Sequence, residues 1–320
     1  MSASRPAITV AICTFRRAGL LPATLASLAA VERPAQPWEL LIVDNAGEPA
    51  VAGLVETWRD RLPIRYAAEP EVGVARARNR AVTQAAAPVI LFADDDVQFD
   101  RHWLGAMAQA VAGHPECQFW GGRVEPVWGQ PRPKWFDAAR CPGLGDMLVR
   151  YDRGLQPRYW DPDAPHDDPP FYTANLALRV EAVRGAGLFD VTLGHRGLER
   201  GSGEDSWMVK RLYAGGARGW YAADALVYHP VEPGRLTKSY ARRFAWRQGR
   251  VSVDLLRRES TPGAAPGRTP RWLYRRALTQ AGAGAARWAA GTCRRDPGLA
   301  FAGEFAAIFN GSKLLHALRT

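Results

Sequence analysis

The chain has 320 residues, of which 47% are hydrophobic and 23% charged, a composition that excludes a predominantly disordered protein and fits either one large domain with an appendage or two smaller domains. Its four cysteines form no C-x-x-C pair, which argues against a zinc site or a disulfide framework and favours a reducing compartment. The net charge of +10 resides in residues 236–320, which hold 16 Lys/Arg and 4 Asp/Glu, whereas residues 1–235 hold 26 and 28 and are nearly neutral.

Short apolar strands alternate with helical segments in the first hundred residues, which indicates βαβ units and a mostly parallel sheet. We expect strands at 7–15, 38–45, 63–69 and 88–96, and helices at 20–30 and 74–87. Ligands of open α/β sheets bind beyond the carboxyl ends of the strands, so the polar residues at the strand ends should converge on one crevice. No G-x-G-x-x-G or P-loop pattern supports a dinucleotide fold or a P-loop enzyme.

Three consecutive aspartates, Asp94–Asp96, follow the last of these strands directly. Adjacent carboxylates raise one another's pKa unless a cation or a set of hydrogen-bond donors holds them. The sequence therefore predicts a positive partner at this strand end.

Residues 120–170 are rich in Trp, Pro and Gly and lack periodicity, which predicts a long irregular insertion. Its tryptophans suit stacking against sugar rings, or they form the core of the loop itself. A further strand is expected at 220–230, ending near His229. From residue 236 onward the pattern becomes helical, with a linker at 258–270.

Six segments, in this order and at these separations, resemble the family 2 glycosyltransferases, which are inverting enzymes with the A-type nucleotide-sugar-binding fold. The resemblance spans roughly residues 6 to 232. The segments are "TVAICTFRR", "LLIVDNAG", "GVARARNRA", "ILFADDDV", "TANLALRVEAVRGAGLFD" and "GSGEDSWMVKRLYAGGARGWYAADALVYHP".

The resemblance implies that the aspartates hold a divalent cation and the donor. Asp94 and Asp95 match donor-binding positions, and Asp94, Asp96 and His229 match metal-binding ones. Carboxylates together with diphosphate oxygens suit Mn²⁺ or Mg²⁺. The alternative is an acidic turn that caps the following helix.

By the same resemblance, Thr14, Arg16 and Asp44 line the nucleobase, and Arg78 places a cation near the donor phosphates or base. A carboxylate can accept a hydrogen bond from a uracil or guanine N–H. The alternatives are an Asx turn at Asp44 and a solvated helix face at Arg78.

Asp205 matches the catalytic base of the family, which takes the proton of the acceptor hydroxyl as that oxygen attacks the anomeric carbon. Glu204 would then support or orient it. The pattern Ser202-x-x-Asp205 also resembles a capping box at the start of a helix, an arrangement that satisfies N-terminal amides.

We therefore expect a catalytic domain at 1–235, divided into a nucleotide-sugar-binding half at 1–100 and an acceptor-binding half at 101–235, followed by a basic helical extension at 236–320. The predicted activity is metal-dependent inverting transfer from a nucleoside diphosphate sugar, a UDP-sugar by preference, in cell-envelope or extracellular polysaccharide or glycolipid synthesis. A sugar-1-phosphate nucleotidyltransferase and a non-catalytic nucleic-acid-binding protein are the alternatives.

The sequence shows no signal peptide and no run of roughly 18 apolar residues that would span a membrane. We therefore expect a cytoplasmic protein. Aromatic residues and arginines alternate in residues 236–320, a mixture that suits an anionic membrane surface, where the acceptor would be a saccharide or a lipid-linked saccharide. The alternative is that the extension packs on the protein, and nucleic acid is the less favoured partner.

Overall fold

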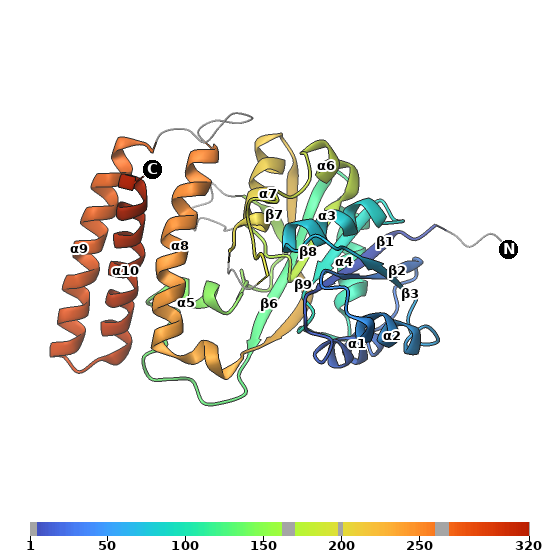
Figure 1. Ribbon diagram of the computed structural model, residues 1–320, viewed down its shortest axis with the longest axis horizontal. Coiled ribbons are helices and arrows are strands. Elements are labelled where there is room, and N and C mark those ends of the chain that lie inside the picture. Colours follow the sequence, from blue (N-terminus) through green and yellow to red (C-terminus); the bar gives the residue numbers. More distant parts are fainter. Residues whose placement is uncertain (1–4, 162–169, 198–200, 260–268, 320) are drawn as a thin grey trace. The chain divides into compact units, whose positions relative to one another are not determined.

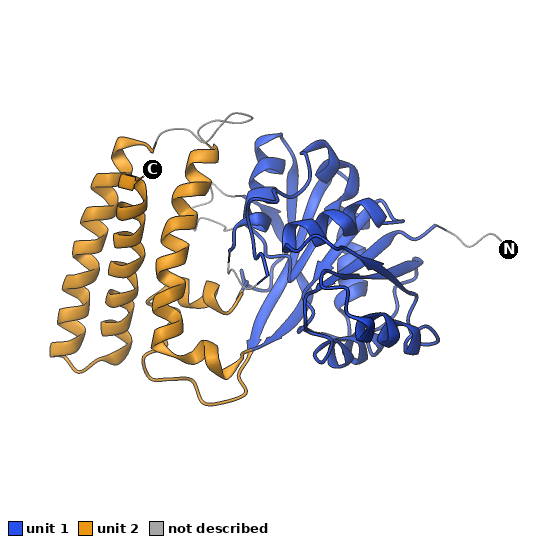
Figure 2. Ribbon diagram, viewed as in Figure 1, with its two compact units in different colours: residues 1–126, 151–230 blue, residues 127–150, 231–320 orange. Residues whose placement is uncertain are grey.

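The computed structural model describes residues 5–161, 170–197, 201–259 and 269–319 (Figure 1). Within the predicted insertion and the predicted linker, residues 162–169 and 260–268 lie outside the described part of the chain. The chain divides into two compact units (Figure 2). Unit 1 comprises residues 1–126 and 151–230, and unit 2 comprises residues 127–150 and 231–320.

Unit 1 contains one mixed sheet with helices around it. Its strands are β1 (Ile8–Thr14), β2 (Trp38–Asp44), β3 (Ile64–Ala68), β4 (Val89–Ala93), β5 (Gln98–Phe99), β6 (Cys117–Val127), β7 (Arg158–Trp160), β8 (Asn175–Arg179) and β9 (Arg218–Pro230). Its helices are α1 (Leu21–Ala29), α2 (Pro49–Thr57), α3 (Val74–Gln84), α4 (Trp103–Gly113), α6 (Val180–Gly185) and α7 (Glu204–Ala214).

The first half of the sheet is parallel and has the order β3-β2-β1-β4. Strands β1, β2 and β4 are nearly continuous apolar runs, and β4 is buried along its whole length, as expected for strands that are covered on both faces, whereas the edge strand β3 is only partly buried. The chain leaves β1 toward β2 and β3 but returns from β3 to β4. Right-handed crossovers therefore place α1 and α2 on one face and α3 on the other, as Figure 1 shows.

The second half of the sheet is antiparallel, since β8 pairs with β4, β6 with β8, and β9 with β5 and β7. The buried Asn175 ties this half together: its amide donates to the carbonyls of Arg123 and Ala225 at 2.8 Å each, and it accepts from the Trp103 indole at 2.9 Å. The predicted α/β fold class is confirmed, with a sheet that is parallel only up to β4.

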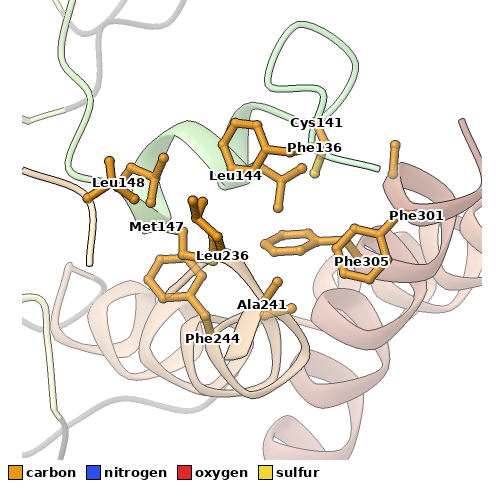
Figure 3. Packing of buried hydrophobic residues seen from close by; sticks show 13 residues of the cluster. Phe136, Cys141, Leu144, Met147, Leu148, Leu236, Ala241, Phe244, Phe301 and Phe305 are labelled. Carbon is orange, nitrogen blue, oxygen red and sulfur yellow. The ribbon is translucent and has the colours of Figure 1, made fainter. Parts of the chain in front are cut away.

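Unit 2 is helical. Its elements are α5 (Pro142–Met147), a 3₁₀ turn (Pro233–Leu236), α8 (Lys238–Glu259), α9 (Arg271–Cys293) and α10 (Pro297–Arg319). Figure 3 shows its core, where Phe301 and Phe305 of α10 lie with Leu144 of α5 and Phe244 of α8. Segment 127–150, expected in the acceptor-binding half, belongs to unit 2 because Phe136, Cys141 and the apolar residues of α5 bury themselves in this cluster.

Glycines bring α9 and α10 into close contact. A Cβ at Gly284 would lie 2.6 Å from the backbone nitrogen of Ala307, and one at Gly291 would lie 2.3 Å from that of Ala300. Gly303 is equally restricted by the backbone of α9. In the described part of the chain, no helix combines the length and the hydropathy needed to cross a membrane.

Candidate active site

The carboxyl ends of β1, β2 and β4 meet at one edge of the sheet, because Thr14 is in register with Asp44 and Asp94–Asp96 follow β4. Asp95 is held toward the protein interior. One of its carboxylate oxygens accepts from the Thr14 hydroxyl at 2.8 Å, and the other pairs with Arg17 at 2.7 Å. Its carbonyl accepts from the Thr24 hydroxyl at 2.8 Å. The predicted convergence of strand ends is therefore present at β1 and β4.

The two flanking aspartates lie beside His229, at the end of β9. Ligand atoms of Asp94, Asp96 and His229 all lie within 4.8 Å of one another. The Oδ1 atom of Asp96 is buried, has no hydrogen-bond partner among the described residues, and lies 3.5 Å from Nε2 of the buried His229. Two carboxylates and one imidazole form a donor set that Mn²⁺ accepts, and Mg²⁺ accepts such carboxylates. The residues present therefore fit the predicted cation.

Burial and mutual repulsion raise the pKa values of two of these aspartates. Burial is the main cause of the increase at Asp95, to about 6, and Arg17 and the Thr14 hydrogen bond oppose it. Burial also raises the pKa of Asp94, and the neighbouring Asp96 adds to that effect. Positive charge at this site therefore lowers the cost of ionising both carboxyls.

Arg17 supplies that charge, and the sequence analysis missed it. It pairs with Asp95 and, at 2.9 Å, with Asp96. The predicted Arg16 is exposed, has a positive φ of 54°, and lies over the Phe15 ring at 5.3 Å. The sequence contains two adjacent arginines, Arg16 and Arg17, and adjacency alone does not show which of them faces the sheet.

A buried ion pair joins the start of α7 to α3. Arg78 hydrogen-bonds Glu204, and their side chains are 9% and 7% exposed. Two further bonds join α3 to the segment between α6 and α7: the Asn79 amide donates to the Phe189 carbonyl at 2.9 Å and accepts from the Phe189 N–H at 2.8 Å. The alternative of a solvated helix face at Arg78 is wrong, because the guanidinium is buried and lies beside acidic side chains.

Arg78 connects the two groups of acids electrostatically. Burial lowers its pKa, but the charges of Glu204, Asp205 and Asp94 outweigh burial and raise it above its usual value. The guanidinium of Arg78 therefore acts on the carboxyl groups of both Asp205 and Asp94.

Asp205 lies in the first turn of α7 and is partly buried. Burial, followed by the charge of Glu204, raises its pKa to about 6, while Arg78 lowers it. Such a carboxyl is ionised at neutral pH and more basic than usual, as a general base requires. The N-cap is Gly203 rather than Ser202, and Asp205 accepts from the Ser206 N–H at 2.7 Å.

Asp44 is fully buried and accepts four hydrogen bonds from the protein. The donors are the N–H groups of Ala46, Gly47 and Glu48, at 2.6–3.0 Å, and the Tyr66 hydroxyl at 3.1 Å. These bonds fix the loop between β2 and α2, which is the turn-forming role weighed as the alternative. A nucleobase contact by Asp44 stays a prediction.

The tryptophans of the predicted insertion pack into protein cores. Trp120 is fully buried, and Trp160 is 5% exposed, contacts Phe119 edge-on and packs against Phe171 at a tilted angle. Trp128 and Trp135 pack against the core of unit 2. These positions favour the core interpretation over stacking on sugars.

The sequence is similar to those of known glycosyltransferases. Residues 9–171 match the model of Glycosyl transferase family 2. The succinoglycan biosynthesis protein ExoM of Rhizobium meliloti is 26% identical over 253 residues, which cover 78% of this chain and 75% of that protein. Validoxylamine A glucosyltransferase of Streptomyces hygroscopicus subsp. jinggangensis is 26% identical over 66% of this chain, which spans only 52% of that enzyme.

Solved structures share the fold. A mannosyltransferase of Pyrobaculum calidifontis, in complex with GDP-Man and Mn²⁺, aligns with a TM-score of 0.56 at 18% identity, covering 99% of this chain and 76% of that one. Residues 1–349 of TarS from S. aureus, in complex with UDP-GlcNAc, align with a TM-score of 0.51 at 16% identity, covering 96% and 90%.

Proposed function

Because this chain belongs to glycosyl transferase family 2, we propose that it catalyses the metal-dependent, inverting transfer of a sugar from a nucleoside diphosphate sugar to an acceptor hydroxyl. The observation that carries the proposal is the cluster of Asp94, Asp96 and His229, which shares the field of Arg78 with Asp205. Family membership favours glycosyl transfer over nucleotidyl transfer and over non-catalytic nucleic-acid binding.

Asp94, Asp96 and His229 would hold the divalent cation, Mn²⁺ or Mg²⁺. When bound, the cation supplies positive charge that stabilises the departing diphosphate. Arg17 pairs with Asp95 and Asp96 and thereby helps to hold both carboxylates in place. Asp95 and Thr14 stay candidate donor contacts; both are buried, and the hydrogen bond between them fixes both side chains.

Asp205 takes the proton of the acceptor hydroxyl at its carboxylate. Its raised pKa of about 6 increases its basicity but still leaves it ionised at neutral pH. Glu204 is not placed to act as this base, because its buried carboxyl group hydrogen-bonds Arg78. Glu204 and Arg78 instead orient the first turn of α7, from which Asp205 projects.

A UDP-sugar is the preferred donor, and Arg16, Asp44 and Arg78 stay candidate donor contacts. The relatives are named for succinoglycan biosynthesis and for glucosyl transfer to validoxylamine A, which supports a saccharide or a lipid-linked saccharide as the acceptor. The product would belong to cell-envelope or extracellular polysaccharide or glycolipid, made at the inner face of the cell membrane.

A thermal-shift screen tests the donor site, because a ligand that binds only the native state raises the melting temperature. The purified protein is titrated with UDP, GDP, dTDP and CMP, each with Mn²⁺, Mg²⁺ or EDTA. We expect one nucleotide, UDP, to stabilise the protein only with a divalent cation. The double variant Asp94→Asn, Asp96→Asn should lose this shift.

The matched control is Asp60→Asn, Asp224→Asn, which removes the same two charges from exposed positions of unit 1. The control should keep the full shift. Metal-independent stabilisation by UDP, or full transfer activity in excess EDTA, would contradict the metal site.

A further inference from the structure

Helix α9 leaves most of its surface exposed in unit 2. It buries only a narrow stripe, made of Leu273, Ala277, Gly284 and Gly291. Large apolar side chains lie outside this stripe: Trp272 is 51% exposed, Leu278 62% and Trp288 49%. A helix that only supports its own protein usually turns such side chains inward.

The charges on this helix all have one sign. Residues 271–295 contain six arginines and no aspartate or glutamate. Arg275, Arg276 and Arg287 are exposed, and none of them forms an ion pair with another residue of the described ranges. Arg276 lies over the Trp272 ring at 5.9 Å. A solvated helix usually mixes acidic and basic side chains, so α9 lacks the charge pattern of a surface that faces only water.

Charge decides between the possible occupants of this surface. A second copy meeting it through the same helix would place arginine against arginine. An anionic bilayer neutralises these side chains, while tryptophan rings sit well at the level of the lipid headgroups. Each arginine near such a membrane strengthens binding by roughly fivefold.

We propose that the α9 surface, defined by Trp272, Arg275, Arg276 and Leu278, lies on an anionic membrane. The inference rests on the proposed function, since it identifies the part of the chain that brings the enzyme to a lipid-linked or membrane-bound acceptor. The two arginines pair with lipid phosphates and carboxylates, and the exposed Trp272 ring enters the headgroup region. Binding is reversible and weakens with salt, because the attraction is mainly electrostatic.

Cosedimentation with vesicles tests this. The full chain is mixed with phosphatidylcholine vesicles or with vesicles that also contain roughly 30% phosphatidylglycerol, at low and at high salt. We expect binding to the anionic vesicles at least about tenfold tighter than to neutral ones, and lost at high salt.

Two variants locate the contact. Arg275→Glu, Arg276→Glu and, separately, Trp272→Ser, Leu278→Ser should each weaken anionic-vesicle binding by about tenfold or more. The control Arg33→Glu, Arg80→Glu makes the same change in net charge at exposed positions of unit 1 and should bind like the unaltered protein. All these side chains are exposed, so melting temperatures should stay within a few degrees of the unaltered protein, about what surface substitutions cause.

Equal binding by the α9 variants and the control would overturn the inference, as would no binding to anionic vesicles at low salt. A dimer in sedimentation that the α9 variants abolish, without vesicle binding, would assign the surface to a second copy. Tight, salt-dependent binding to duplex DNA in place of vesicles would assign it to nucleic acid. The UDP-dependent thermal shift of each variant is measured in parallel, so loss of membrane binding is distinguished from failure of the proposed function.

Discussion

Replacing Arg78 by Met should destabilise unit 1 more than any exposed arginine substitution does. The side chains of Arg78 and Glu204 are 9% and 7% exposed, so the change leaves a buried carboxylate without its cation. Breaking a buried pair in this way costs about 3–5 kcal/mol. For a domain of this size each kcal/mol lowers the melting temperature by roughly 2–4 °C, so a decrease of roughly 6–20 °C is expected.

The same helix offers a matched control. Arg76 pairs with Glu71 at 2.7 Å, but these side chains are 37% and 67% exposed. Arg76→Met should cost less than about 1 kcal/mol, because solvent screens an exposed pair. The assay is urea unfolding of both variants at pH 7.5, followed by circular dichroism.

Arg78→Met should also change the pH dependence of transfer. Arg78 lowers the pKa of Asp205, which is about 6, so removing the guanidinium raises that pKa. Asp205 acts as a base only when ionised, and the acid limb of the rate profile should therefore move to higher pH. Equal losses of stability in Arg78→Met and Arg76→Met, or an acid limb that stays at about pH 6, would refute the role assigned to the pair.

Three further substitutions have definite expectations. Asp205→Asn should reduce turnover by about 10²–10⁴ with UDP affinity retained. The native pKa of Asp205, about 6, lies above the ordinary 3.8, so ionising this carboxyl destabilises the folded protein, and the substitution should stabilise it above pH 6 by at most about 3 kcal/mol. Below pH 4 this stabilisation should be absent, which unfolding measurements at both pH values check. Arg17→Ala should weaken Mn²⁺-dependent UDP binding measured by calorimetry, since it removes the guanidinium that pairs with Asp95 and Asp96, and unchanged Mn²⁺-dependent UDP binding would contradict this assignment. Asp44→Asn should cost about 1–3 kcal/mol through its loop hydrogen bonds, and normal stability combined with poor UDP binding would instead favour a nucleobase contact.

Local pattern was sufficient for much of the fold. Apolar runs separated by helical periodicity predicted β1 to β4 with α1 and α3 to within about three residues, because buried parallel strands require continuous apolar sequence. Because Asp94–Asp96 directly follow the apolar run of β4, the sequence also placed them at the edge of the sheet where the parallel strands have their carboxyl ends. The resemblance to family 2 glycosyltransferases, rather than local pattern, grouped Asp94, Asp96 and His229, whose ligand atoms lie within 4.8 Å of one another.

Only the tertiary structure decided the contacts that depend on how distant segments meet. It chose Arg17 over Arg16, because the left-handed backbone at Arg16 turns one arginine to solvent and leaves the other beside Asp95. It paired Arg78 with Glu204, which lie 126 residues apart. It also assigned segment 127–150 to unit 2, since periodicity describes the faces of an element but not the partner against which each face is buried.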